Sequence, residues 1–116
     1  MTRQFEKWVS KQEISLEELR KALDEVVSGN YEAALGGHIY KKRIRFENAS
    51  KSGSGRTIIC YKQDNNAIFI HGFSKNEKDS LGRTELAALK YLAKVLLSMT
   101  QEQVVAAVET GKFKEL

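Results

Sequence analysis

The 116-residue chain has room for one domain with one hydrophobic core, which we expect to span residues 1–116. Its composition, 41% hydrophobic and 29% charged with a net charge of +4, is typical of a globular protein. No apolar run reaches the roughly 20 residues of a membrane span, and the N-terminal segment does not resemble a signal peptide. The single cysteine, Cys60, excludes an intramolecular disulfide and suits a reducing compartment. We therefore expect a cytoplasmic protein without a membrane partner.

Two helices are predicted first. Phe5, Trp8 and Val9 lie at helical spacing and indicate a short helix. A second helix should begin at a capping box formed by Ser15 and Glu18, in which hydroxyl and carboxylate satisfy backbone donors reciprocally. It carries leucine and valine side chains on one face and should end near residues 29–30.

Three strands follow and predict an antiparallel sheet. Residues 39–46 alternate between two faces, so that Lys41, Arg43 and Arg45 share one face and Lys42 lies on the other. Residues 57–62 and 67–73 are β-branched and aromatic, and the Asn and Asp residues between them tolerate the conformations of a hairpin turn. The polar residues 48–55 are expected to form a loop.

The remaining chain predicts two more helices. One should run to about Ser98, and a capping box of Thr100 and Gln103 should begin a short final helix that ends near Gly111. The predicted fold is α+β: two N-terminal helices, a three-stranded antiparallel sheet, and C-terminal helices packed on one face. In this arrangement the helices would cover a single face of the sheet.

Positive charge is concentrated in residues 41–56, KKRIRFENASKSGSGR. This segment holds six lysines or arginines and one acid, whereas the whole chain nets only +4. One interpretation is a solvated outer face, because exposed strands use charge to resist aggregation. However, Arg56 should return beside the strand cations, and converging like charges repel unless an anion neutralises them. This convergence favours a site for a polyanion such as nucleic acid.

Other motifs have weaker signals. The glycines of Lys51–Arg56 could let main-chain N–H groups approach a phosphate, although the order of a Walker A motif is absent. His71 alternates with Phe69 and Phe73 and is interpreted first as a packed residue, with catalysis as the alternative. Tyr61 could either stack on a base or pack. Two histidines and one cysteine without a close cluster predict no metal site, and we expect no cofactor.

A series of short motifs closely resembles the HigB-like branch of the RelE superfamily, which comprises bacterial type II toxins encoded beside an antitoxin. The resemblance runs in order over residues 5–97 and rests on Leu35-Gly36-Gly37, Lys42-Arg43, Lys51-Ser52-Gly53, Arg56, the segment GFSKNE from Gly72, and Glu85-Leu86. It implies a microbial-RNase-like fold and a cognate antitoxin, expected to be of the helix-turn-helix type.

The resemblance also implies an mRNA endoribonuclease that acts on ribosome-bound message without a metal or cofactor. The ribose 2′-hydroxyl would attack the adjacent phosphate, with proton transfer by Lys42 or Lys51. Arg43 and Arg56 would hold the scissile phosphate. The remaining residues assigned by this hypothesis are Lys75 as an assisting cation, His71 as a reserve acid/base, and Lys41, Arg45 and Tyr61 as RNA-binding residues.

The chain departs from the family pattern in two places. Ser54 stands where a KSGG-like loop would have glycine. Some RelE-type toxins have an acid/base tyrosine or histidine near the C-terminus, after the last strand, whereas here the C-terminus is predicted to be helical and Tyr91 lies in mid-helix. The alternation of side chains along the strand also places Lys42 and Arg43 on opposite faces. Both could therefore contact one phosphate only if a bulge or a twist of the strand intervened. Two alternatives remain open: a noncatalytic toxin of the same fold that inhibits a protein such as gyrase, as ParE relatives do, and a plain nucleic-acid-binding module.

Overall fold

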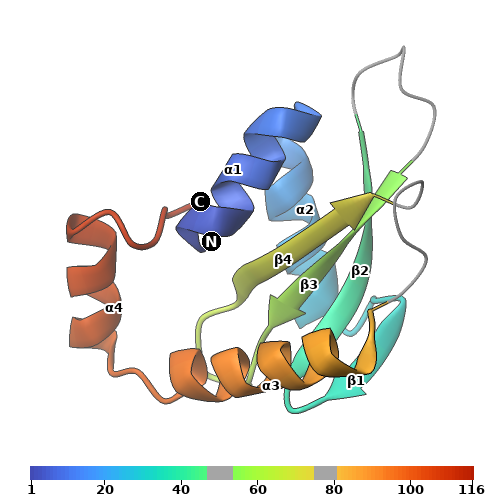
Figure 1. Ribbon diagram of the computed structural model, residues 1–116. Coiled ribbons are helices and arrows are strands. Elements are labelled where there is room, and N and C mark those ends of the chain that lie inside the picture. The colour runs from blue at the N-terminus through green and yellow to red at the C-terminus, as the bar shows by residue number, and fades with distance from the viewer. Residues whose placement is uncertain (47–53, 75–80) are drawn as a thin grey trace.

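The structure, a computed structural model, describes residues 1–46, 54–74 and 81–116. It has the α+β class predicted from the sequence (Figure 1). The helices and strands are, in chain order, α1 (Arg3–Gln12), α2 (Leu16–Val27), β1 (Ala33–Gly36), β2 (Ile39–Arg45), β3 (Ser54–Cys60), β4 (Ile68–Ser74), α3 (Arg83–Leu97) and α4 (Gln101–Glu109). No helix within these ranges is long and apolar enough to cross a membrane.

The predicted helix starts are confirmed by their caps. The hydroxyl of Ser15 accepts a hydrogen bond from the backbone N–H of Glu18 at 3.1 Å, as the sequence pattern predicts. At α4, the Thr100 hydroxyl accepts from the Gln103 N–H at 3.2 Å, while the Gln103 side chain accepts from the Thr100 N–H at 2.8 Å. This reciprocal pair is a complete capping box.

The sheet has the order β1-β2-β3-β4, with antiparallel pairing throughout, so the prediction of three strands missed one. The additional strand, β1, is only four residues long and pairs with the start of β2. Its two alanines carry little intrinsic strand preference, which explains the omission. The turn into β2 uses Gly37 and His38, both with positive φ, and the stem of Lys90 from α3 lies 3.3 Å from where a Cβ on Gly37 would be.

Helices cover both faces of the sheet, so the expectation of a single covered face is wrong. On one face, α1 and α2 pack on the sheet through a cluster that includes Phe5, Leu19, Ile44, Ile59 and Phe69. On the other face, α3 packs on it through a cluster that includes Ile39, Ile58, Cys60, Leu89 and Ala93. The physical reason lies in β3, whose last four residues are all buried, as expected of a strand that is covered on both sides.

One strand contains a residue more than its neighbour. Ile59 of β3 pairs with Phe69 of β4, and Ile58 pairs with His71, so that Ile70 has no partner opposite it. Such a β-bulge interrupts the alternation of side chains. Phe69 therefore faces α1, whereas His71 shares the α3 face with its partner Ile58. The two-residue spacing of Phe69 and His71 would place both on one face of a regular strand, and the bulge places them on opposite faces.

Two glycines make room for the indole of Trp8 on α1. An ideal Cβ on Gly72 would lie 2.3 Å from Trp8 Cε3, and one on Gly55 would lie 2.9 Å from Phe46 Cζ and 3.0 Å from Trp8 Cη2. Both glycines thus turn their missing side chains toward α1. The residues next to them, Arg56 and Phe73, must project to the opposite face.

Cys60 is fully buried, and this burial raises the pKa of its thiol from 9.0 to about 11. In the unfolded chain the thiol ionises first as the pH rises, so the free energy of unfolding should fall between pH 9 and about 11. The loss would amount to at most about 2–3 kcal/mol. We expect Cys60→Ala to reduce the pH dependence of stability in this window, as measured by urea unfolding below and above it. An identical pH dependence in the variant would contradict the assignment.

Candidate anion-binding site

Two arginines from neighbouring strands lie directly opposite each other. Arg43 of β2 pairs with Arg56 of β3, and Phe73 of β4 lies on the other side of Arg56. Directly paired residues project to the same face, which here is the α3 face. The prediction that Arg56 returns beside the cations of β2 is therefore confirmed. We call Arg43 and Arg56 the arginine pair.

The two guanidinium groups share one acceptor. Arg43 Nε donates to the Ser54 hydroxyl at 3.1 Å, and Arg56 Nη1 donates to the same oxygen at 3.3 Å. Arg56 Nη1 also lies 3.4 Å from the carbonyl oxygen of Gly55. A serine hydroxyl has two acceptor lone pairs, so it can bind both donors at once. Ser54, the residue that departs from the family pattern, thus links the arginine pair.

An acid that was not among the predicted site residues completes the arrangement. Glu32 lies just before β1, and its Oε2 is 2.7 Å from Arg56 Nε. The Arg56 side chain is 11% exposed, whereas Arg43 is exposed. Glu32 lies in a segment without a periodic pattern of apolar and polar residues. No sequence pattern therefore connects it to Arg56, which is 24 positions further along the chain. Among the residues that the structure describes, the site therefore consists of one enclosed cation, one open cation, a shared hydroxyl and a carboxylate.

Lys42 lies on the other face of the sheet, as strand alternation predicts. Its Nζ is 3.5 Å from Oε2 of Glu25 on α2 and donates a hydrogen bond to the carbonyl oxygen of Asn30 at 3.2 Å. β2 is regular along its pairing with β3, and no bulge brings Lys42 round to Arg43. This geometry holds the Nζ of Lys42 at α2 and separates it from a phosphate bound on the α3 face, so it does not support proton transfer by Lys42, which stays a prediction.

His71, by contrast, shares the α3 face with the arginine pair. It is a diagonal neighbour of Arg56 across β3 and β4, a relation that places backbones about 7–8 Å apart. The imidazole is half-buried, and its ring centroid is 6.0 Å from that of Phe73. The bulge in β4 produces this placement, so the one histidine of the strand lies beside the cationic site and not beneath α1.

The remaining predicted residues separate into three groups. Lys41 and Arg45 share the α3 face with Arg43 and extend the line of positive charge along β2. Tyr61 follows the end of β3 opposite to Arg56, five residues or about 16 Å away at the rise of a strand, so it does not join the arginine pair. Lys51 and Lys75 lie outside the described residues.

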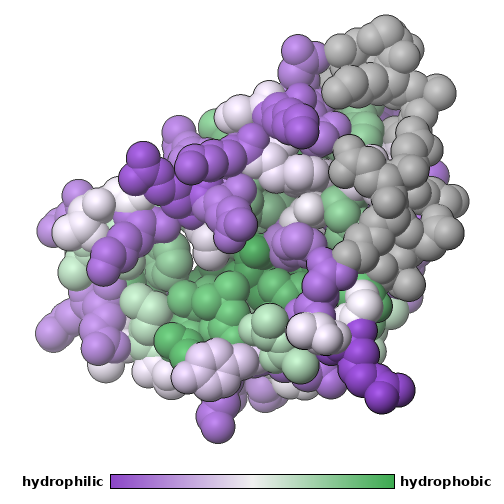
Figure 2. All heavy atoms as spheres, viewed as in Figure 1, coloured by the Kyte–Doolittle hydropathy of each residue, from purple (hydrophilic) through white to green (hydrophobic). Residues whose placement is uncertain are grey.

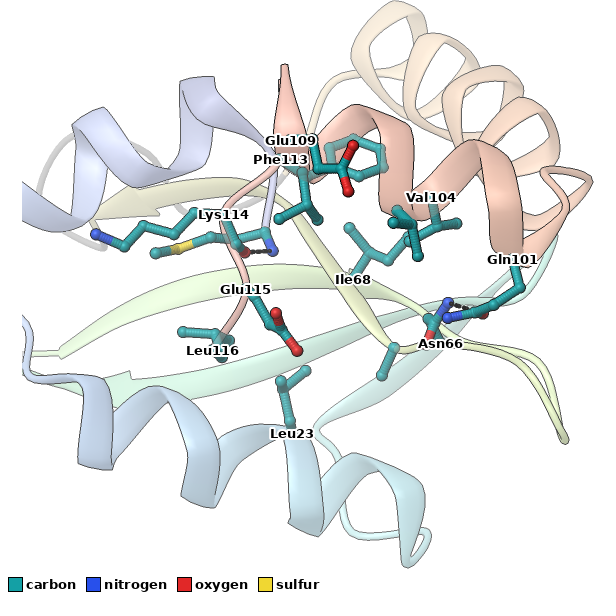
Figure 3. Close-up of a pocket in the computed structure, with 14 residues that line it drawn as sticks. Leu23, Asn66, Ile68, Gln101, Val104, Glu109, Phe113, Lys114, Glu115 and Leu116 are labelled. Atoms are coloured by element: carbon teal, nitrogen blue, oxygen red, sulfur yellow. Dashed lines mark hydrogen bonds between the residues drawn. The ribbon is translucent and has the colours of Figure 1, made fainter. Parts of the chain in front are cut away.

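Of two hollows in the surface, one lies away from the arginine pair and the other borders it. A cleft of about 460 Å³ separates α4 from the start of β4 and the C-terminal segment, and its apolar lining includes Leu23, Ile68, Val104, Phe113 and Leu116 (Figure 3). A more polar groove of about 700 Å³ lies between α2 and β2, and its lining includes Arg43 and Ser54. The acids Glu18 and Glu25 on its α2 wall are outnumbered by the basic side chains that line it, which are Lys21, Lys42, Arg43 and Arg45.

The side of the molecule drawn in Figure 2 is partly apolar. A band of hydrophobic residues crosses the middle of this view, above α3. On α3 itself, Tyr91 is 71% exposed and Val95 is 44% exposed. Exposed apolar side chains of this kind are suited to a protein partner more than to RNA. Within the described ranges, no group of three or more His, Cys, Asp and Glu side chains could hold a metal ion.

The fold and the site together define a small α+β domain with a pair of arginines, a candidate anion site, on one sheet face. The chain belongs to the RelE family, because it matches the family model described as the RelE toxin of the RelE/RelB toxin–antitoxin system over residues 1–116. It is therefore a toxin of a toxin–antitoxin system, and this membership implies a cognate antitoxin as partner. No curated protein and no solved structure gives a significant match to the chain.

Proposed function

We propose that this toxin is a metal-independent mRNA endoribonuclease of the HigB-like branch that cuts ribosome-bound message in the cytoplasm. The observation that supports the proposal best is the arginine pair, two in-register guanidinium groups bonded to one hydroxyl, with His71 on the same face. Guanidinium groups match the geometry of phosphate oxygens and keep their charge at any physiological pH.

The proposed reaction is internal transesterification of RNA. The ribose 2′-oxygen forms a bond to the adjacent phosphorus, and the bond from phosphorus to the 5′-oxygen of the next nucleotide breaks. The products are a 2′,3′-cyclic phosphate and a free 5′-hydroxyl. In the pentacoordinate transition state, negative charge grows on the phosphate oxygens, and Arg43 and Arg56 would stabilise it. Lys41 and Arg45 would bind neighbouring phosphates.

The reaction also needs a group that takes a proton from the 2′-hydroxyl and one that gives a proton to the leaving oxygen. Among the predicted acid/base residues that the structure describes, His71 is on the face of the arginine pair and Lys42 is not. Imidazole exchanges protons near neutral pH, so His71 is our candidate for one of the two transfers. Lys51 and Lys75 stay predictions for the other.

A defined test uses purified protein with programmed ribosomes and a labelled message. We expect cleavage into fragments that carry a 5′-hydroxyl and a 2′,3′-cyclic phosphate. Intact message under conditions in which the same preparation arrests growth would overturn the proposal. Growth arrest with altered DNA supercoiling would point to a gyrase-type target, and salt-dependent RNA binding without cleavage or toxicity would point to a binding module.

A further inference from the structure

The guanidinium group of Arg56 is held on two sides by other residues. Its Nε lies 2.7 Å from Glu32 Oε2, and its Nη1 donates to Ser54 at 3.3 Å. Within the part of the chain that the structure describes, the contacts of Arg56 use Nε and Nη1, and none uses Nη2. The side chain is only 11% exposed, so its orientation is set by these contacts and not by solvent.

The carboxylate that holds Arg56 is itself fixed to the sheet. The backbone N–H of Glu32 donates to the carbonyl oxygen of Lys41 at 2.8 Å, which ties the residue to β2 immediately before β1 begins. The acid therefore reaches Arg56 from a strand edge that is part of the same sheet. A charge-assisted bond between an anchored carboxylate and a guanidinium restricts the rotation of both groups.

The carboxylate of Glu32 relieves the repulsion between Arg43 and Arg56, which favours the folded state. An acid beside a phosphate site also weakens the attraction of the site for a polyanion, so removing it should strengthen RNA binding. Any benefit of the acid to RNA cleavage must therefore come from another effect. A guanidinium group held at Nε offers its remaining N–H groups in one fixed direction, and a misplacement of about 1 Å can cost about 100-fold in rate.

We propose that Glu32 is a positioning residue, which together with Ser54 orients the guanidinium of Arg56 toward the RNA phosphate. The inference rests on the proposed ribonuclease function and adds a residue to it. Glu32 acts through Arg56 and does not itself exchange a proton with RNA. Ser54 has the second part of this role, because it sets the separation between Arg56 and Arg43.

The chain offers a closely matched control on the opposite face. Glu25 pairs with Lys42 as Glu32 pairs with Arg56, and the side-chain exposures are nearly equal: 33% and 12% in the first pair, 37% and 11% in the second. Glu25→Gln and Glu32→Gln each remove one negative charge beside an enclosed cation. General electrostatics predicts the same small gain in RNA affinity for both.

The experiment compares the two variants in single-turnover cleavage of a message bound to programmed ribosomes. We expect Glu32→Gln to lower the rate constant at saturating programmed ribosomes by about 100-fold, with KM little changed and the shape of the pH profile preserved. Glu25→Gln should cleave like the wild type. Equal activity of the two variants would overturn the proposal, and so would loss of the acidic limb of the pH profile in Glu32→Gln, since this would make Glu32 a general base.

A second measurement does not depend on cleavage. In the wild type, the NMR signal of the Arg56 Nε–H group should exchange slowly with water and shift on addition of an uncleavable RNA that lacks the 2′-hydroxyl. Both properties should be lost in Glu32→Gln and kept in Glu25→Gln. A wild type that shows them but cleaves no RNA would refute the proposed activity and leave the positioning role intact, whereas a signal unchanged in Glu32→Gln would refute the positioning role alone.

Ser54→Ala provides a variant without a change of charge, in case Glu32→Gln does not fold. It removes the oxygen that both guanidinium groups share. We expect it to lower the cleavage rate while a thermal melt shows an intact fold. Wild-type cleavage by Ser54→Ala would contradict the proposed linkage of the arginine pair.

Discussion

Replacing Arg56 with alanine should lower the rate of RNA cleavage by about 100- to 1000-fold, the loss typical of removing one donor to a developing oxyanion. The physical reason is that Arg56 is the enclosed member of the arginine pair, held in place by Glu32 and Ser54. Its contribution should be larger in the transition state than in the RNA complex. A gel-based single-turnover assay would measure the effect, with a thermal melt to show that the variant is folded.

Lys42→Ala is the appropriate control for this variant. It removes one positive charge from the adjacent strand, but on the face that packs against α2. A site based on local geometry predicts a far smaller loss for Lys42→Ala than for Arg56→Ala, because only a screened, long-range attraction is reduced. Similar losses in the two variants would mean that total charge, and not the arginine pair, determines activity. Arg56→Lys should stay well below the wild-type rate, since lysine lacks the planar fork of donors.

Gly72→Ala should destabilise the protein by about 2–3 kcal/mol, as expected of overpacking in a well-filled core. The added Cβ would lie 2.3 Å from the indole of Trp8, and because glycine and indole are both held by the rigid contact between α1 and β4, neither can move without disturbing the other. We expect a melting temperature lower by roughly 10 °C. Urea unfolding provides the free energy directly.

A double-mutant cycle can show whether the clash with Trp8 causes the loss of stability in Gly72→Ala. In a Trp8→Leu background the indole is gone, and Gly72→Ala should cost much less than it does in the wild type. A cost that is the same in both backgrounds would show that the loss comes from backbone conformation and not from the clash with Trp8. The cycle also tests whether α1 is as closely packed on β4 as the structure indicates.

Much of the site could be predicted from local patterns. The period of two in residues 39–46 placed Lys42 and Arg43 on opposite faces, and the hairpin order of the strands brought Arg56 back beside Arg43. Both predictions depend on neighbouring residues or on consecutive strands. Glu32 and Ser54 were missed as site residues because their roles arise from side-chain contacts across the sheet, which no periodicity encodes.

The errors in the predicted fold have similar physical origins. A four-residue strand with two alanines has almost no pattern, so β1 was not recognised. The second covered face could have been inferred from the consecutive buried residues Thr57–Cys60, which do not alternate with polar side chains. The bulge at Ile70 could not have been inferred from the sequence, because one extra residue in a strand has no sequence signature of its own.

That extra residue lets Phe69 and His71 face opposite sides of the sheet although they lie two positions apart. If β4 kept its length but paired without the bulge, alternation from Phe69 would turn the imidazole of His71 toward Trp8 and place Gly72 on the face of Arg56. If Ile70 were absent instead, Phe69 and His71 would be consecutive, and plain alternation would keep both on the faces that they have now. A relative of the toxin with one residue fewer at this point can therefore retain the proposed site, so a one-residue gap at Ile70 in an alignment is no sign of a lost site.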